Sequence, residues 1–185
     1  MRLKSHFSVI LITLMKILRL AVALLVLQLA LAAQQSSTAL LEITGNVPHP
    51  KIYQDQEWKA LKHVSITATN EHDKKTATFS GVPLHDLLKE AGVPSDENLR
   101  GKALTTCIIV TATDGYQVAF SIAELDEGIG NLQVLVADSE DGKPMGQNAG
   151  PLRLIVPSDK RPARWVRMVK TIRVEANPST TSPQD

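Results

Sequence analysis

Hydrophobic and polar residues alternate along much of the chain after residue 38, and this period of two is typical of β-strands with one buried face. Asp114-Gly115 lies between two such runs and predicts a hairpin turn. The polar residues 70–74 predict a second turn, across which two strands pair. The runs that we expect to form strands are 39–45, 63–70, 75–79, 105–113, 116–122, 131–138, 152–156 and 164–175.

One segment, residues 83–93, changes to the helical period. Its apolar residues recur every three or four positions, at Leu84, Leu87, Leu88 and Ala91. Pro83 suits the first helical position and Gly92 suits a helix C-cap. This segment predicts a short amphipathic helix against a sheet. The sequence as a whole predicts a single α+β domain, mostly β, with one or two short helices.

The N-terminal residues have the pattern of a secretory signal. Basic residues at 2 and 4, and again at 16 and 19, precede an uninterrupted apolar run over 21–33 that ends in small residues. The run is shorter than the roughly 20 residues that a membrane span needs. We expect a signal peptide over 1–33 and a periplasmic or secreted protein. An uncleaved N-terminal anchor and a true start at Met15 remain alternatives.

The remaining boundaries follow from composition. We expect a flexible linker over 34–41, the folded domain over 42–175 and a disordered tail over 176–185. Four of the 20 basic residues precede residue 34, so 16 basic residues face 19 acidic ones in the mature chain, a net charge of about −3. This charge predicts that nucleic acid is not a partner.

Few residues suggest catalysis or metal binding. Cys107 is the only cysteine, so no internal disulfide forms, and its apolar neighbours predict a buried side chain. The histidines show no metal-binding spacing, and His85 falls on the exposed side of the predicted helix. No nucleophile elbow, phosphate loop or dinucleotide fingerprint occurs. We assign no catalytic residue and no metal ligand.

Basic residues crowd the segment 160–173. Arg167 and Arg173 fit an edge strand, where cations keep other strands from pairing. A loop that contains Lys160, Arg161 and Arg164 fits this explanation less well. Its repulsion is better tolerated if a bound anion such as phosphate, or nearby carboxylates, compensate the charge. Upstream, Asn148 and Arg153 flank a Gly-rich loop, for which the spacing alone favours a plain turn.

The order of segments resembles the oxidoreductase molybdopterin-binding domain of the sulfite oxidase family from about residue 42 to 174. The likeness rests on FSGVPLHDLLKEAGV, on TATDGYQVAF, and on GPLRLIVP followed by a basic segment and WV. It implies a mostly β fold that holds the pterin-based molybdenum cofactor. It also implies that Asn148, Arg153, Arg161 and Arg164 contact this cofactor, with the basic cluster at its phosphate.

One departure affects the expected activity. Catalytic members of the family carry a cysteine ligand to molybdenum in the stretch before GVPL, and residues 65–79 contain no cysteine. We expect a protein that binds a pterin cofactor or another small anion without sulfite-oxidase-type catalysis. The alternatives are an oxidoreductase subunit that depends on a protein partner, and a structural or sensory module. A membrane would be contacted only through an uncleaved N-terminal segment.

Overall fold

The computed structural model describes residues 39–70 and 72–176. The predicted signal peptide, most of the predicted linker and nearly all of the predicted tail lie outside these residues. The first strand begins at Leu41, one residue before the expected domain boundary, and the last strand ends at Glu175. Within the described part of the chain, no helix is long and apolar enough to cross a membrane.

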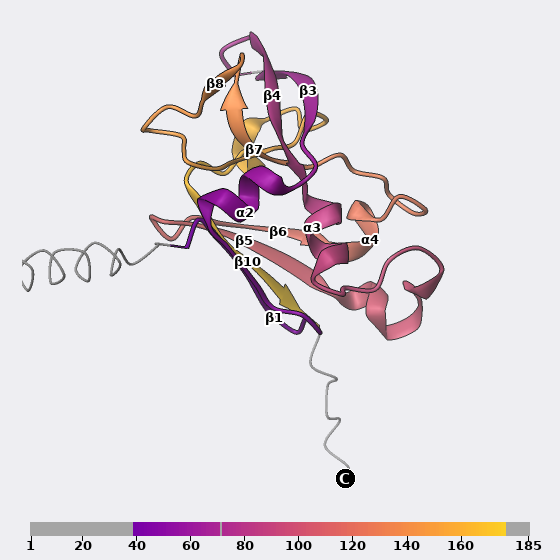
Figure 1. The fold of residues 1–185 in the computed structure, drawn as a ribbon. Coiled ribbons are helices and arrows are strands. Elements are labelled where there is room, and N and C mark those ends of the chain that lie inside the picture. The colour runs from indigo at the N-terminus through magenta and orange to yellow at the C-terminus, as the bar shows by residue number, and fades with distance from the viewer. Residues whose placement is uncertain (1–38, 71, 177–185) are drawn as a thin grey trace, which may run out of the picture. The chain divides into compact units, whose positions relative to one another are not determined.

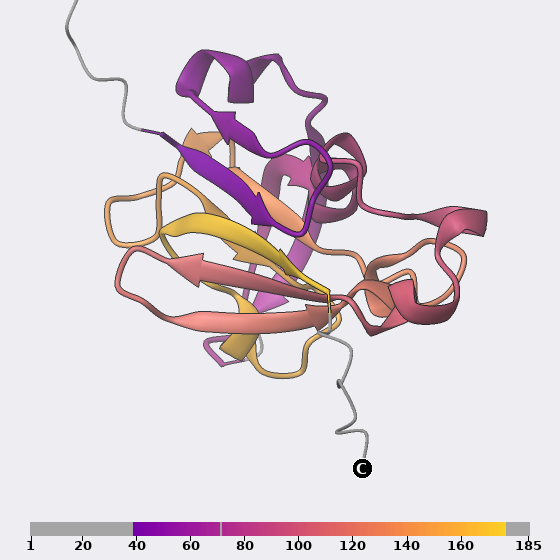
Figure 2. The same ribbon diagram turned by 90° about the horizontal axis from the view of Figure 1, so that it is seen from below.

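Five strands form the first sheet, in the order β2-β1-β10-β5-β6. β1 runs parallel to β10, and the other neighbours are antiparallel. Figure 2 shows β1, β10, β5 and β6 side by side. The bounds are β1 (Leu41–Gly45), β2 (Lys51–Tyr53), β5 (Cys107–Ala112), β6 (Gln117–Ser121) and β10 (Val169–Glu175).

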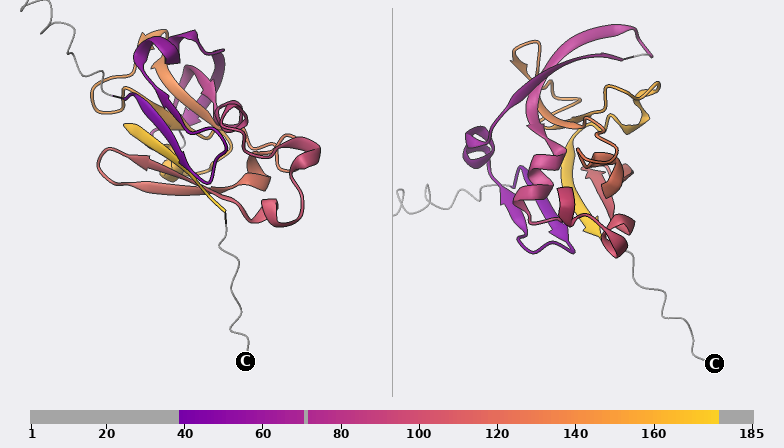
Figure 3. Two further views of the ribbon diagram at one scale, coloured as in Figure 1. Left: turned by 60° about the horizontal axis from the view of Figure 1, so that its bottom comes forward. Right: turned by 90° about the vertical axis from the view of Figure 1, so that its right-hand side faces the viewer.

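The second sheet has the order β3-β4-β7-β8, and β9 also pairs with β7. All of its pairs are antiparallel. The β3–β4 hairpin reaches beyond the other elements (Figure 3, right). The bounds are β3 (Val64–Asn70), β4 (Lys75–Pro83), β7 (Leu135–Glu140), β8 (Lys143–Pro144) and β9 (Arg153–Ile155).

Short helices connect the strands (Figure 1). They are α2 (Asp55–Ala60), α3 (Leu84–Glu90), α4 (Ile122–Leu125), η1 (Asp96–Asn98), η2 (Gly101–Thr105) and η3 (Pro162–Arg164). One hydrophobic core contains residues of both sheets and of the helices, among them Ile172, Val136 and Leu87, all without solvent exposure. The fold is α+β and mostly β, as the sequence predicts.

The helix prediction is correct, but the strand before it is longer than expected. β4 continues to Pro83, which caps the helix α3 rather than opening it. A side chain at Gly81 would place its Cβ 2.1 Å from the Val136 carbonyl oxygen, so β4 and β7 can approach this closely only with glycine there. Gly92 follows the helix with φ +80°, the conformation of a glycine C-cap.

The prediction that the last strand lies at a sheet edge is wrong. β10 lies between β1 and β5, so Arg173 does not protect an edge; its guanidinium pairs with Glu175 at 2.6 Å. The expected alternation also fails at the start of β10. The register shifts between Val169 and Thr171, which buries Val169 and leaves Lys170 exposed.

Candidate functional site

Trp165 is the centre of the candidate site. Its indole Nε1 donates to the Val156 carbonyl oxygen at 2.8 Å, and its ring meets Phe79 edge-on at a centroid distance of 5.8 Å. The Arg153 guanidinium carbon lies 5.6 Å from the Trp165 ring centroid and 5.9 Å from that of Phe79. Two aromatic rings therefore hold the arginine by cation–π contacts.

Arg153 is an incompletely compensated cation. Its Nε is buried and makes no hydrogen bond within the described residues. Its ion-pair partner there, Glu140, stands 3.8 Å away and also binds Lys75 at 2.5 Å. Burial lowers the pKa of Arg153, an effect opposed by Glu140 and reinforced by the nearby charge of Arg167. The protein thus keeps a desolvated guanidinium whose donors are not all used.

A cavity of about 190 Å³ opens beside Arg153. Its wall comes from the β3–β4 hairpin, β7, β9 and the segment after η3. The residues that line it are Asn70, Asp73, Lys75, Ala77, Phe79, Glu140, Arg153 and Trp165. The charged part of this lining contains two cations and two carboxylates, so the cavity is polar without being strongly basic.

A second cavity, of about 230 Å³, also has Trp165 in its lining. It is formed where the Asp114-Gly115 turn meets η3. Asp114 accepts a hydrogen bond from the Tyr116 backbone at 2.9 Å, and the Tyr116 hydroxyl donates to the Ala163 carbonyl oxygen at 2.8 Å. The full lining is Asp114, Tyr116, Pro162, Ala163, Trp165, Val166 and Arg167. We call the two cavities together the Trp165 site.

Arg164 has a different environment. Its Nε and one terminal nitrogen bind Asp159 at 2.9 and 2.7 Å, and the other terminal nitrogen binds Glu124 at 3.1 Å. The guanidinium carbon also lies 4.6 Å from the Phe120 ring centroid. These carboxylates raise the pKa of Arg164, with the Asp159 hydrogen bonds as the largest cause. Its charge is balanced within the protein.

The structure does not bring the four predicted cofactor contacts into one cavity. Arg153 lines the Trp165 site, whereas Arg164 is held by Asp159 and Glu124. Asn148 and Arg161 are exposed, and neither lines a cavity described above. Asn148 lies in the turn closed by hydrogen bonds from Ala149 and Gly150 to Gly146, which agrees with the plain-turn interpretation of the loop.

Sequence reasoning missed several residues of the site. The sequence pattern indicated that Arg167 was an edge-strand cation and not a site residue. Trp165 contributed only to the family resemblance, as part of the WV motif. Tyr116 begins one of the predicted strands, but half of its surface is exposed, and its hydroxyl donates to the Ala163 carbonyl oxygen in η3. These contacts join segments about 50 residues apart, so a local sequence pattern cannot predict them.

Cys107 is not part of the Trp165 site. It begins β5, whereas the turn that lines the site follows the other end of this strand, roughly 17 Å away at about 3.3 Å per residue. Contrary to expectation its side chain is only partly buried, on the face opposite Ile108 and Val110. Within the described residues, no group of three or more His, Cys, Asp or Glu could hold a metal ion.

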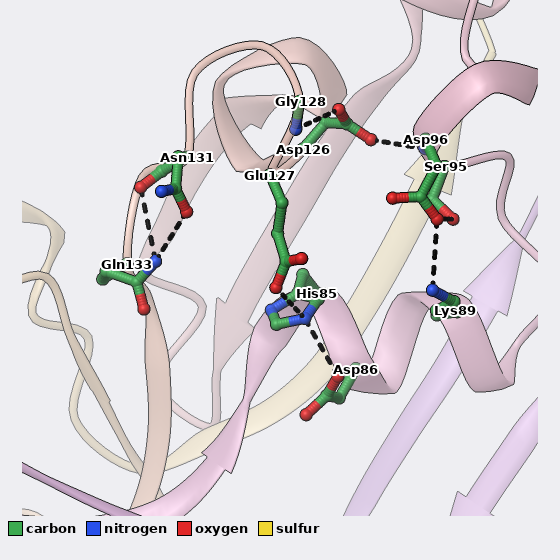
Figure 4. A network of polar contacts seen from close by, with 10 residues as sticks. All are labelled: His85, Asp86, Lys89, Ser95, Asp96, Asp126, Glu127, Gly128, Asn131 and Gln133. Atoms are coloured by element: carbon green, nitrogen blue, oxygen red, sulfur yellow. Dashed lines mark hydrogen bonds and ion pairs between the residues drawn. The ribbon is translucent and has the colours of Figure 1, made fainter.

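A third polar cluster surrounds His85, which the sequence predicted to be solvated. His85 Nε2 lies 2.9 Å from Asp86 Oδ1 and 3.2 Å from Glu127 Oε1 (Figure 4). The neighbouring Asp126 is buried, and its carboxylate accepts backbone hydrogen bonds from Asp96 and Gly128. The adjoining cavity of about 30 Å³ holds roughly one water. These contacts fix loops against α3 and leave no room for a substrate.

Comparisons with known proteins agree with the fold. The family model for the oxidoreductase molybdopterin binding domain matches residues 29–182. The sulfane dehydrogenase SoxCD from Paracoccus pantotrophus is similar in structure, with a TM-score of 0.59 and 18% identity. This alignment covers 76% of the present chain and 39% of that chain, and at this identity it shows the fold alone. A search of curated proteins gives no match. On the family match, this chain belongs to the oxidoreductase molybdopterin-binding domain family of the sulfite oxidase type.

Proposed function

We propose that this protein is an exported domain that binds the anionic group of a pterin cofactor, or a smaller anion, at the Trp165 site, without sulfite-oxidase-type catalysis. The ligand's negative charge would lie near Arg153 and Arg167. Phosphate is a suitable group because guanidinium donors match its oxygens. The aromatic wall formed by Trp165 and Tyr116 suits a flat heterocycle.

The observation that carries the proposal is the charge imbalance at Arg153. A buried Nε without a hydrogen-bond partner, on a guanidinium that is only 16% exposed, costs free energy unless a ligand compensates it. Its nearest carboxylate is shared with Lys75, and Arg167 adds a further positive charge nearby. An anion in the adjacent cavity would offset this cost. Such unbalanced groups are typical of binding sites.

The same residues fit the metal part of the cofactor poorly. The molybdenum cofactor supplies oxygen-atom or electron transfer at its metal when it is bound, and a protein thiolate normally anchors and tunes such a metal. Here the single thiol, Cys107, belongs to the far end of β5. We therefore derive no catalytic step, and we limit the proposal to holding the pterin or its phosphate.

The experiment is a measurement of cofactor content. The full chain is produced with its own N-terminus in a host that makes molybdopterin, and the protein is purified from the export compartment. Pterin is released by acid oxidation and quantified by fluorescence, and molybdenum is measured by mass spectrometry. We expect about one pterin per chain. Protein that carries no pterin, from a host shown to load another molybdopterin protein, would overturn pterin binding.

Export is supported by the basic and apolar pattern of residues 1–33. The intact mass of the purified protein tests it: we expect the mass of a chain that starts close to residue 34. A full-length mass in the membrane fraction would instead favour the uncleaved anchor.

An oxidoreductase subunit is the second candidate, favoured by the family and by the name of SoxCD as a sulfane dehydrogenase. This candidate requires a protein partner to complete the activity. Molybdenum equal in amount to pterin, together with a partner that co-purifies and restores electron transfer, would support it over the binding-only proposal.

A further inference from the structure

A separate and larger cavity, of about 430 Å³, lies between α2, the end of β7 and the β7–β8 turn. Ligand pockets typically measure about 300 to 1,000 Å³, so it can hold a small molecule. It shares no residue with the Trp165 site. Most of its lining is apolar: Leu40, Trp58, Pro144, Met145, Pro151 and Leu152.

One carboxylate, that of Asp138, is fixed in the wall of this cavity. Its Oδ2 accepts hydrogen bonds from the Trp58 indole Nε1 and from His63 Nε2, each at 2.8 Å. Its Oδ1 makes no hydrogen bond with any described residue, and the side chain is 27% exposed. One oxygen is therefore used to hold the group in place, and the other remains an unused acceptor.

His63 helps to orient Asp138. Its Nδ1 lies 2.9 Å from the Leu61 carbonyl oxygen, and its Nε2 lies 2.8 Å from Asp138 Oδ2. An Nε2–H group donates to Oδ2, so Oδ1 is the carboxylate oxygen left for a ligand. Asp55 and Lys59, which also line the cavity, balance each other in an ion pair at 2.5 Å.

We propose that the Asp138 cavity binds a small neutral molecule with an apolar, ring-sized body and a single hydroxyl or N–H group that donates to Asp138 Oδ1. The apolar lining provides the burial, and the oriented carboxylate provides the selectivity for a donor. A cationic ligand is disfavoured because burying its charge among the apolar side chains costs more free energy than one partly exposed carboxylate returns.

Two isomeric probes test the requirement for a donor. p-Cresol carries a hydroxyl donor, whereas anisole has the same atoms and only an ether acceptor. The chain has two tryptophans, so the indole N–H signals of Trp58 and Trp165 can be followed separately by NMR. We expect p-cresol to shift the Trp58 signal while the Trp165 signal stays in place. Its affinity should exceed that of anisole by about tenfold, the value of one hydrogen bond to a charged group. Benzylammonium should bind more weakly than p-cresol.

A matched substitution tests the role of the carboxylate. In Asp138→Asn the amide oxygen can accept from Trp58 and His63, which turns the amide NH₂ toward the cavity as a donor. The preference for p-cresol over anisole should then disappear. Glu97→Gln, an exposed change outside the cavity, should leave the preference intact. In a second variant, Met145→Trp, the larger side chain should fill the cavity and weaken both probes.

Several results would overturn the inference. They are equal affinities for p-cresol and anisole in the unmodified protein, tighter binding of benzylammonium, or shifts of the Trp165 signal in place of the Trp58 signal. If Asp138→Asn does not fold, the comparison of probes in the unmodified protein together with Met145→Trp decides the question, and probe affinities unchanged by Met145→Trp would contradict the site.

Discussion

Two arginines eleven residues apart, Arg153 and Arg164, differ in how completely the protein neutralises their charge. Arg164 has three hydrogen bonds to two carboxylates and an aromatic ring beneath it. Arg153 has two aromatic rings, one carboxylate 3.8 Å away and a buried Nε without a partner. Arg164 lies within the conspicuous basic cluster of the sequence, yet its charge is neutralised.

The difference shows that clustering along the chain is a weak guide to an anion site. Carboxylates that are distant in sequence, such as Glu124, can cancel a run of basic residues. An isolated arginine on a strand can remain uncompensated when apolar residues surround it. The balance of charge in three dimensions is the reason why we propose the anion site at Arg153 and Arg167 instead of at Arg161 and Arg164.

The largest expected difference in stability is that between the Arg164→Met and Arg153→Met variants. Arg164→Met leaves Asp159 and Glu124 without their cation, and because Asp159 is mostly shielded from water we expect a loss of about 2 kcal/mol in the free energy of unfolding. Arg153→Met replaces an incompletely paired, mostly shielded cation by an apolar side chain and should cost less than about 0.5 kcal/mol or stabilise the fold. Urea unfolding measures both. Equal losses would contradict the contrast.

Glu140→Gln should raise the affinity of the Arg153 cavity for an anion. The change removes the carboxylate that faces both Arg153 and Lys75, so the cavity becomes more positive. We expect pyrophosphate to bind about fivefold more tightly, an effect that decreases as salt is added. Glu124→Gln, the matched change beside Arg164, should leave pyrophosphate affinity unchanged. Calorimetric titration measures both variants, and a gain in Glu124→Gln alone would place the site at Arg164 instead.

The smallest expected effect on stability comes from the partly exposed ion pair of Lys51 and Glu90. It shows what an ordinary surface pair contributes, for comparison with the two arginines. Glu90 accepts from Lys51 at 2.8 Å and from the Tyr53 hydroxyl at 2.9 Å, and the Lys51 hydrogen bond is the main reason that the pKa of Glu90 lies below its ordinary value. A lowered pKa in the folded state stabilises the protein above the ordinary value of 4.5. This contribution fades as the pH falls below that value and through the lowered pKa.

Glu90→Gln should therefore destabilise the protein by only about 0.5 kcal/mol at pH 7, because the pair is partly exposed. The difference between Glu90→Gln and the unmodified protein should shrink toward zero as the pH is lowered to about 3. Urea unfolding at several pH values measures it. If the difference in unfolding free energy grew as the pH was lowered, the pKa of Glu90 would not be lowered in the folded protein.

The sequence predicted most strands and the helix α3 because their apolar residues repeat with clear periods. It missed β2, α2 and α4, which are three to six residues long and too short to display a period. The bulge at Val169 shifted the last strand out of its apparent alternation. Within the site, Arg153 was predicted through the family resemblance. Carboxylates were one of two explanations for the basic loop of Arg164, but Glu124 could not be named as a partner because it comes from α4.

The most direct test of the central claim is the pterin content of two matched variants, Arg153→Met and Arg161→Met, purified beside the unmodified protein from the export compartment of a molybdopterin-producing host. Both variants exchange an arginine for methionine, one in the wall of the cavity and one on the exposed surface. We expect Arg153→Met to lose most of its pterin and Arg161→Met to keep it. Pterin retained by Arg153→Met and lost from Arg161→Met would show that the cofactor does not bind at Arg153.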